Sequence, residues 1–438
     1  MDNPPLPRPI ILSDTATLEG RLLILSFLFM GINLAALALV RGFRISDWLM
    51  LLVWSIAAGG AVLILDRYLP KRDPLIFPIT MFLTGWGLVM IDRLSDGFIY
   101  NFADRQTLWM VFGVIAMLVM ATRPEPLVWL REYRYITLIG GLLLLLSTIL
   151  FGTNPSGFSY APQLWLGANG IYFQPSELLK IVLVGFLASY LAEQYPALRA
   201  IGIQPRNDIV MFSPRILGPI LLMWGLCIVI LVWQRDLGAA AIFFGVFILL
   251  LYMTSGQPLV LVSGLGLMII AGISAYFVFD VVQARVDIWL DPWSQADSGA
   301  FQVVQSLIAF GEGGVFGRGI GQGAPNYIPV VHSDFVFAAI AEEYGLLGVI
   351  AVCVCLAVLV TRTLKSAIAH SSRPFYALMV TGISGLIALQ SLLILGGTLR
   401  LVPLTGVTLP FVSYGGSSLL TSFIMVGLLL RLSEPSRP

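Results

Sequence analysis

The stretch GAAAIFFGVFILLLYMTSGQPLVLVSGLGLMIIAGISAYFVF, residues 238–279, contains no charged side chain. A helix needs about 20 consecutive, mostly apolar residues to cross the hydrocarbon core of a bilayer. This stretch is therefore long enough for two transmembrane helices, which we predict at residues 238–254 and 259–279. Similar apolar segments lie on both sides of it, so this pattern decides the fold class.

The composition of the whole chain agrees with a membrane protein. Of its 438 residues, 58% are hydrophobic and 11% are charged, whereas charged residues make up about 25% of ordinary soluble domains. About twelve segments are long and apolar enough to span a bilayer. We predict an all-α polytopic membrane protein, in which two added helices (1–74) precede a body of about ten helices (75–438). The predicted spans are residues 22–40, 48–65, 75–91, 108–121, 135–151, 176–193, 216–233, 238–254, 259–279, 334–360, 376–396 and 411–430.

The distribution of Lys and Arg predicts the orientation of the chain. Basic residues concentrate in loops that share one side, namely 67–73, 123–134, 199–215 and 362–373. Because cytoplasmic loops carry the excess of Lys and Arg, both termini are predicted to be cytoplasmic. Residues 1–20 are polar and proline-rich and show no cleavable signal peptide, so we expect the first apolar segment to be a membrane helix.

The polar segment 280–332 is placed outside the cytoplasm by this orientation. Arg285 lies near its start, and Asp297 precedes a Ser-Gly pair whose flexibility leaves the carboxylate free to meet a ligand. A base in such a position could draw a proton from a hydroxyl nucleophile. Glycines alternate at positions 317, 319, 321 and 323 without the Lys-Ser/Thr of a phosphate loop. Backbone amides freed by these glycines can form an anion-binding nest around Arg318.

Three further polar stretches interrupt the apolar segments, at 152–180, 234–238 and 396–418. They lie mainly on the same predicted outer side, which favours one shared site. Glu177 and Lys180 are spaced i, i+3 and can pair on one helical face. An ion pair at membrane depth is costly, so it indicates either a functional site or a structural tie between helices. The residues alone leave both interpretations open.

A fourth group of charged residues marks the start of the predicted span 334–360. His332 and Asp334 come just before it, and Glu342 and Glu343 follow inside it. Adjacent helical residues point about 100° apart, so at most one of these two glutamates faces any single cavity. The other must find an arginine, a water molecule or a backbone partner.

The last polar stretch contains Ser413 and Ser417 among small residues before the final span. Irregular backbone at membrane depth is tolerated only where it lines a cavity or is covered by protein. In the 234–238 turn, Arg235 and Asp236 are expected to be interfacial caps, because a snorkelling arginine is the commoner outcome there.

Cysteine and histidine usage argues against a metal centre built by the protein. Cys227, Cys353 and Cys355 lie in apolar segments without metal-ligand spacing, so we interpret them as packing residues. The chain has two histidines, His332 and His370, too few for a site built from histidine ligands.

Five stretches, in this order, resemble the SEDS family (shape, elongation, division and sporulation), whose members RodA and FtsW polymerise the glycan strands of peptidoglycan. The stretches are FQPSELLK (173–180), QRDLG (234–238), WLDPW through GRGIGQG (289–323), HSDFVFAAIAEEYGLLG (332–348) and LVPLTGVTLPFVSYGGSS (401–418). The similarity covers roughly residues 75–431, and several matches in family order are far more specific than one short motif.

The resemblance implies a glycosyltransferase at the outer face of the bacterial plasma membrane, acting in elongation or division. Its implied partners are the lipid-linked disaccharide-pentapeptide precursor, a class B penicillin-binding protein and membrane lipids, with no role for nucleic acid. Asp297 is the implied catalytic base, and arginines or a divalent cation (Mg or Mn) would stabilise the leaving pyrophosphate. The implied substrate-binding residues are Glu177, Lys180, Arg285, Arg318, His332, Asp334, Glu342, Glu343, Ser413 and Ser417.

The chain departs from the family pattern at the position of the implied catalytic aspartate. Where the family usually has an aspartate two residues after DPW, this chain has Gln295, and Asp297 follows two places later. We predict that Asp297 takes the role through a locally shifted loop, since a Gly/Ser-flanked loop is flexible. Leu164 stands where the family has an arginine, and Arg235 where it has a proline.

Two other functions remain open from the residues. A transporter or flippase for the lipid-linked precursor would also show many spans, buried charges and broken helices, although no half of the chain is repeated. A catalytically weak scaffold for a penicillin-binding protein is the other alternative, because of Gln295.

Overall fold

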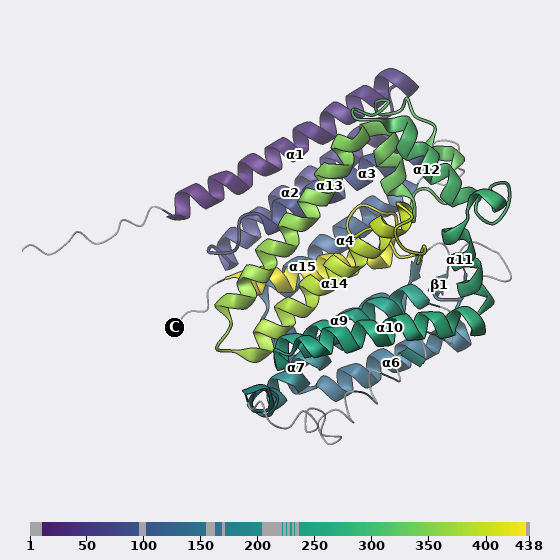
Figure 1. Cartoon of the computed structure of the whole chain (residues 1–438). Coiled ribbons are helices and arrows are strands. Elements are labelled where there is room, and N and C mark those ends of the chain that lie inside the picture. Colours follow the sequence, from purple (N-terminus) through teal and green to yellow (C-terminus); the bar gives the residue numbers. More distant parts are fainter. Residues whose placement is uncertain are drawn as a thin grey trace, which may run out of the picture.

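The protein folds into a bundle of long helices (Figure 1). The computed structural model describes residues 11–95, 102–154, 163–168, 171–203 and 236–434, with single residues between 221 and 232. The long helices are α1 (Ile11–Arg41), α2 (Ile45–Tyr68), α3 (Ile76–Leu94), α4 (Phe102–Thr122), α6 (Arg134–Phe151), α7 (Pro175–Ile203), α9 (Leu237–Ser255), α10 (Pro258–Val278), α13 (Val336–Ala369), α14 (Pro374–Thr398) and α15 (Gly416–Ser433). The shorter elements are α5 (Glu125–Glu132), α11 (Asp280–Leu290), α12 (Phe301–Gly313) and the antiparallel strands β1 (Leu166–Ala168) and β2 (Ile171–Phe173).

The long helices agree with the predicted spans. Among the described residues, 11 helices are long and apolar enough to cross a membrane, and each corresponds to one predicted span. The remaining predicted span, 216–233, lies outside the described residues. In lipid no water is available to the backbone, so each apolar segment satisfies its own N–H and C=O groups as a helix. The prediction of an all-α polytopic membrane protein is confirmed.

The predicted start of the last span was wrong, and the segment predicted as a loop contains short helices. The last span was expected from residue 411, but α15 begins at Gly416. Phe411 has φ of +68°, a left-handed conformation that an α-helix does not contain, so the residues before Gly416 form turns. The segment 280–332 was expected as a loop, yet it contains α11 and α12. Both helices are too short to span a membrane and carry polar residues, so the search for long apolar runs did not detect them.

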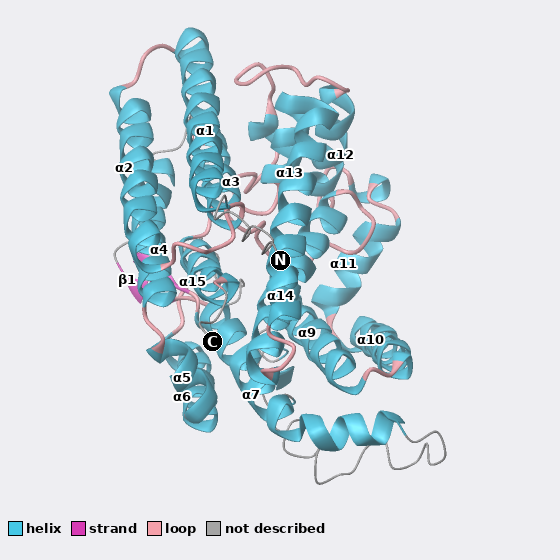
Figure 2. Cartoon of the chain, turned by 90° about the vertical axis from the view of Figure 1, so that its left-hand side faces the viewer, coloured by secondary structure: helices cyan, strands magenta, loops and turns pink. Residues whose placement is uncertain are grey.

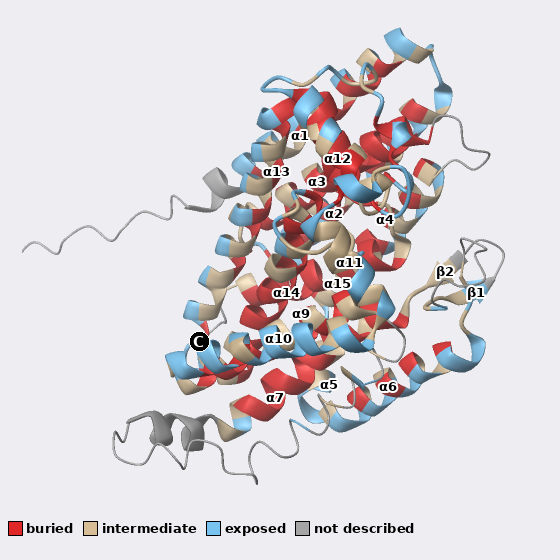
Figure 3. Ribbon diagram, turned by 45° about the vertical axis from the view of Figure 1, so that its right-hand side comes forward, coloured by how far each residue is buried: buried red, intermediate tan, exposed pale blue. Residues whose placement is uncertain are grey.

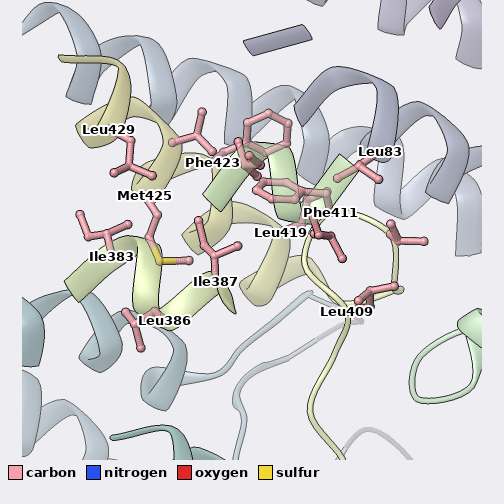
Figure 4. Packing of buried hydrophobic residues seen from close by; sticks show 14 of the residues in the cluster. Leu83, Ile383, Leu386, Ile387, Leu409, Phe411, Leu419, Phe423, Met425 and Leu429 are labelled. Atoms are coloured by element: carbon pink, nitrogen blue, oxygen red, sulfur yellow. The ribbon is translucent and has the colours of Figure 1, made fainter. Parts of the chain in front are cut away.

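Small residues let the central helices approach closely. A Cβ added at Gly427 of α15 would lie 2.4 Å from the backbone oxygen of Met117 in α4. A Cβ at Gly113 of α4 would lie 2.5 Å from the ring of Phe423 in α15. Such glycine contacts are typical of membrane helices, whose association depends on packing rather than on the hydrophobic effect. Figure 4 shows the same core from inside, with Phe423 beside Phe411 and the side chains of α14 facing those of α15.

The helix α13 is broken by Gly345, which has φ of +66° and ψ of −163°. At this break a Cβ on Gly345 would lie 2.3 Å from the backbone nitrogen of Gly317. A Cβ on Gly317 would in turn lie 2.2 Å from the carbonyl oxygen of Glu343. Only glycine fits both positions, because the chain before α13 crosses directly over the break.

The bundle has two unlike ends. The start of α1 and the end of α15 lie at one end, and α11, α12 and the β1–β2 hairpin lie at the other (Figure 1). Helices α1 and α2 form a pair on one flank, and α10 lies on the opposite flank (Figure 2). Most residues of α3, α14 and α15 are buried, whereas few residues of α1 and α10 are buried (Figure 3). The two short helices of the polar segment 280–332 therefore lie at the end of the bundle away from the start of α1.

Candidate active site

A buried ammonium group lies at the start of α7. The side chain of Lys180 is 2% exposed, and its Nζ donates to Glu177 Oε1 at 2.6 Å and to Gln390 Oε1 of α14 at 2.9 Å. Gln390 Nε2 donates to the carbonyl oxygen of Thr408 at 2.8 Å. The predicted Glu177–Lys180 pair is thus present, and it ties α7 to α14 and to the segment before α15. Such a buried ion is retained only with a partner and further hydrogen bonds.

Asp236 extends this cluster to the start of α9. Its carboxylate accepts from the backbone N–H of Ala239 at 3.1 Å, as an N-cap, and from Ser176 Oγ at 3.1 Å. Burial raises the pKa of Asp236, while the Ala239 hydrogen bond and the charge of Lys180 lower it. We call Glu177, Lys180, Asp236 and Gln390 the Lys180 network. Asp236 is the cap that the sequence predicts, but it also faces a charged cluster.

A pocket of about 240 Å³ opens beside this network. It is lined by residues of four segments: Arg285 and Trp289 of α11, Gly299, Gln302 and Val303 around the start of α12, Asp334, and Gly397 at the end of α14 with Arg400 and Gly406 beyond it, among others. A Cβ at Gly406 would lie 3.9 Å from both Arg285 Nη2 and Asp334 Oδ2, so these two charged groups flank Gly406. The pocket therefore brings together two arginines and a carboxylate from segments far apart in the sequence.

Burial acts on both charged groups beside Gly406. It lowers the pKa of Arg285, and the charges of Asp334 and Asp236 oppose that effect. It raises the pKa of Asp334, against a hydrogen bond from Ser333 and the charge of Arg285. Arg285 Nη1 also donates to the carbonyl oxygen of Thr405 at 3.2 Å. The pocket thus holds a partly desolvated guanidinium, which is a strong partner for an anion.

Arg400 joins the end of α14 to the end of α11. Its Nε donates to the carbonyl oxygen of Trp289 at 2.7 Å and its Nη2 to that of Leu290 at 2.5 Å. Trp289 Nε1 donates back to the carbonyl oxygen of Arg400 at 3.1 Å. The last carbonyl groups of a helix have no partner inside the helix, so Arg400 satisfies those of α11 and fixes where the following turn begins.

Asp297 lies in that following turn, residues 293–300, which we call the Asp297 turn. Its carboxylate is exposed and has no hydrogen-bond or ion-pair partner among the described residues. The turn is closed by the carbonyl oxygen of Gln295, which accepts from the N–H of Ser298 at 3.0 Å and of Ala300 at 3.1 Å. Gly299 of the same turn lines the pocket, whereas Asp297 does not. Asp297 therefore stands on an exposed turn that borders the pocket.

The predicted serines are used inside the protein. Ser413 Oγ accepts from the N–H of Leu409 at 2.9 Å and donates to the carbonyl oxygen of Ser333 at 2.6 Å. Ser417 Oγ accepts from the N–H of Gln174 at 2.9 Å. Both hydroxyls hold the turns before α15 against neighbouring segments, so the structure does not bring them into the pocket.

His332 is part of the same internal packing. Its ring stacks on Phe102 with centroids 4.4 Å apart, and Tyr414 meets it edge-on at 5.4 Å. Burial lowers the pKa of His332 to about 4. The imidazole is therefore neutral at physiological pH and acts as an aromatic packing group.

Glu342, Glu343 and Arg318 lie in a separate cluster at the break in α13. Glu343 Oε1 accepts from Arg93 Nε of α3 at 2.9 Å, and Glu342 Oε1 accepts from the N–H of Ala324 at 2.7 Å. One glutamate has thus found an arginine and the other a backbone partner, as adjacent helical residues require. The side chain of Arg318 pairs with exposed Glu312. None of these three residues lines the pocket beside Arg285, which we call the Arg285 pocket.

Sequence reasoning missed Gln390 and Arg400, and it treated Asp236 only as a cap. The available signals were a single amide side chain inside the apolar segment 376–396 and an arginine just after that segment. Leu164 lies just before β1 and is partly buried; Arg235 lies outside the described residues. In the described part of the chain, no group of three or more His, Cys, Asp or Glu side chains could hold a metal ion, and the expected divalent cation stays a prediction.

Comparison with known proteins matches most of the chain to one family. The family model FTSW_RODA_SPOVE, described as "Cell cycle protein", matches residues 74–437. The peptidoglycan glycosyltransferase RodA of Mycobacterium tuberculosis (strain H37Rv) is 36% identical over 385 residues, covering 86% of this chain and 81% of the relative. RodA of Mycobacterium leprae is 34% identical over 434 residues, covering 96% of this chain and 91% of the relative. A probable peptidoglycan glycosyltransferase FtsW of Geobacter metallireducens is 32% identical over 381 residues, covering 84% and 96%.

Solved structures share the fold. One, described as "Structural coordination of polymerization and crosslinking by a peptidoglycan synthase complex", has a TM-score of 0.65 at 23% identity, covering 83% of this chain and 97% of that chain. The rod shape determining protein RodA of Thermus thermophilus has a TM-score of 0.56 at 22% identity, covering 84% and 98%. The architecture described above is therefore that of known multi-pass bacterial membrane proteins.

Proposed function

This chain belongs to the FTSW_RODA_SPOVE family of cell cycle proteins, and from that membership we propose that it is a peptidoglycan glycosyltransferase. It polymerises lipid-linked disaccharide-pentapeptide units into glycan strands, for cell elongation or division. Relatives that share a third of their residues with it carry the name peptidoglycan glycosyltransferase. Its helices, long and apolar enough to cross a membrane, suit an enzyme whose substrate is itself held in the bilayer.

The proposed reaction takes place at the outer face of the membrane, with both termini in the cytoplasm. The excess of Lys and Arg in the loops predicted to lie on the same side as the termini supports this orientation. The elements that surround the pocket, α11 and α12, lie at the end opposite to the start of α1 and the end of α15 (Figure 1). The pocket would then open where lipid-linked sugar units meet the growing strand.

One observation carries the proposal most directly: Arg285, Arg400 and Asp334 converge on a pocket bordered by the Asp297 turn. A glycosyl transfer from a lipid pyrophosphate needs cations for the leaving group and a base for the acceptor. Arg285 and Arg400 supply the cations, because guanidinium groups match phosphate oxygens in geometry and charge. Asp297 supplies the base, since its exposed carboxylate has no partner among the described residues and is open to an acceptor hydroxyl.

The proposed chemical step is a single displacement at the sugar. Asp297 accepts the proton of the acceptor hydroxyl, and the hydroxyl oxygen forms a bond to the anomeric carbon of the donor. The bond between that carbon and the pyrophosphate oxygen breaks, so the pyrophosphate leaves with the electron pair and the configuration inverts. Gln295 cannot replace Asp297 in this step, because an amide has no basic oxygen near neutral pH. A positioned base of this kind contributes about 10²–10⁴-fold to the rate.

A divalent cation would have to take most of its ligands from the substrate. Mg²⁺ commonly binds one or two carboxylates together with phosphate oxygens and water. Asp334 is the carboxylate that lines the pocket beside Arg285, so it is the residue that would hold such an ion. When bound, the ion would neutralise charge on the pyrophosphate.

The proposed protein partner is a class B penicillin-binding protein, which cross-links the strands that the polymerase makes. Support comes from the structural neighbour described as a peptidoglycan synthase complex that coordinates polymerization and crosslinking. The helices α1 and α10, in which few residues are buried, are available to lipid or to partner helices. The choice of partner would decide between elongation and division.

The test of the function is reconstitution with purified lipid-linked precursor and a class B penicillin-binding protein. We expect glycan strands to form without any transfer of precursor across the bilayer. Precursor translocation in protein-containing liposomes, without strand formation, would replace the polymerase by the flippase alternative. Stable binding of the penicillin-binding protein without any strand formation would support the scaffold alternative instead.

A further inference from the structure

A closed ring of buried polar contacts joins α1, α3 and α13. Arg41 of α1 pairs with Asp92 of α3, with side chains 9% and 5% exposed. The next residue of α3, Arg93, donates to Glu343 Oε1 of α13 at 2.9 Å. The residue after Glu343 in α13, Tyr344, contacts α1 and so closes the ring.

Tyr344 Oη donates to Asn33 Oδ1 of α1 at 2.9 Å. The ring of Tyr344 also meets Trp86 of α3 edge-on, with centroids 5.1 Å apart. Asn33 is 8% exposed and its Nδ2 donates to the carbonyl oxygen of Phe29 in its own helix. Each helix thus gives two residues to the ring, and each pair of helices is joined once. We call Asn33, Arg41, Asp92, Arg93, Glu343 and Tyr344 the α1 ring.

The α1 ring also holds the glycine segment 317–323. The N–H groups of Arg318 and Gly319 donate to the carbonyl oxygens of Glu342 and Glu343 at 2.9 and 3.0 Å. At the other end of the segment, Arg93 Nη2 donates to the carbonyl oxygen of Gly323 at 2.9 Å.

Helix α1 touches the segment directly as well. A Cβ at Gly321 would lie 3.1 Å from Leu37 Cδ2 and 3.5 Å from Val40 Cγ1. The glycine segment is therefore packed between α1 and the broken part of α13.

We propose that α1 positions the outer part of the site through this ring, with Asn33, Arg41 and Tyr344 as positioning residues. The proposal rests on the proposed function for its catalytic consequence. Helix α1 precedes the part of the chain that the family model matches, residues 74–437, so it supports the matched body from outside. The glycine segment connects α12, which follows the Asp297 turn, to the start of α13 beside Asp334. By this proposal, loosening the ring displaces two parts of the Arg285 pocket lining, the start of α12 and Asp334.

The test follows the glycine segment with a spin label at Gln322, an exposed position. The label is attached to Q322C in the full-length protein after the native cysteines have been replaced. We expect Tyr344→Phe and Asn33→Leu each to raise the ratio of mobile to immobile label by about twofold to tenfold. This change corresponds to the net free energy of one hydrogen bond. The double variant should be no more mobile than the single variants, because both remove the same contact.

Arg41 is tested by rescue. Arg41→Gln should mobilise the label. Arg41→Lys, which keeps the charge opposite Asp92, should give the spectrum of the immobile label seen in the parent protein. Two controls match the substitutions: Ile32→Ala, beside Asn33 but 68% exposed, and Tyr327→Phe, which removes a hydroxyl from a residue that is 73% exposed. Both should leave the spectrum of the label unchanged.

The same variants are then assayed for glycan synthesis with lipid-linked precursor and partner. Mobilised labels together with strand synthesis lowered by a similar factor would support the positioning role. An unchanged spectrum in Tyr344→Phe and Asn33→Leu, or equal mobilisation by Ile32→Ala, would overturn it. A mobilised label with no strand synthesis by any protein, the parent included, would support the ring and overturn the proposed function.

Discussion

The Lys180 network and the Asp297 turn hold charge in opposite ways. In the network, Lys180 is 2% exposed and has both Glu177 and Gln390 as hydrogen-bond acceptors. In the turn, Asp297 is exposed and has no partner among the described residues. A buried ion without partners is too costly to persist, whereas an exposed carboxylate needs none. The buried charges therefore serve the fold first, and the exposed one is free for chemistry.

This contrast makes opposite predictions for substitutions in the two regions. Changes in the Lys180 network should lower stability before they affect any chemical step. Substitution of Asp297 in the turn should leave stability unaltered and lower the rate. The Arg285 pocket lies between the two regions and should affect the binding of substrate.

The largest stability effect is expected from Lys180→Met, because it leaves Glu177 buried without a cation. Loss of one partner of a buried pair costs about 3–5 kcal/mol. The thermal unfolding midpoint of the purified protein measures the effect. Lys365→Met, at an exposed lysine, is the matched control and should change the midpoint little. Combining Lys180→Met with Glu177→Leu should recover part of the lost stability. If Lys180→Met alone is as stable as the control, the buried ion pair does not serve the fold as this comparison requires.

A smaller effect is expected from Arg285→Gln, and it should appear in substrate binding. A hydrogen bond to a charged group contributes about 1.5–3 kcal/mol, so KM for the lipid-linked precursor should rise by about tenfold to a hundredfold. Arg318→Gln is the control, since that arginine pairs with Glu312 on the surface and does not line the pocket. Equal changes in KM for both variants would mean that the pocket has no special role.

Measured per pH unit, the smallest effect is expected in the pH dependence of stability. Because the pKa of His332 falls to about 4 in the folded protein from about 6.5 when unfolded, the unfolded chain binds the proton more readily. The contribution of His332 is thus fully present above pH 6.5 and is lost as the pH falls toward 4, with a slope of at most ~1.4 kcal/mol per pH unit. His332→Phe should flatten this part of the unfolding profile. A parallel profile for both proteins would contradict the assignment of a neutral, packed imidazole.

The sequence predicts the spans well because one physical requirement determines them. An apolar segment such as 238–279 has no alternative to helices in lipid. The same criterion could not find α11 and α12, which are short and mix polar with apolar residues. It also placed the start of α15 too early, because Phe411 and Val412 are apolar but belong to a turn that packs against Gly87 of α3.

The site was predictable only where partners are close in sequence. Glu177 and Lys180 lie one helical turn apart, so their pairing follows from spacing. Gln390 reaches the site from α14 and Arg400 from just beyond its end, and no local pattern links them to α7 or α11. Ser413 and Ser417 show the reverse case: they lie in a conspicuous polar stretch, but their hydroxyls close turns inside the protein.

The measurement that tests the central claim most directly is the initial rate of strand synthesis by Asp297→Asn in the reconstituted system. The account predicts a fall of about 10²–10⁴-fold with an unchanged unfolding midpoint, and no such fall for Gln295→Asn. An Asp297→Asn protein that makes strands at the parental rate would contradict the account, because the exposed carboxylate would then have no part in the reaction.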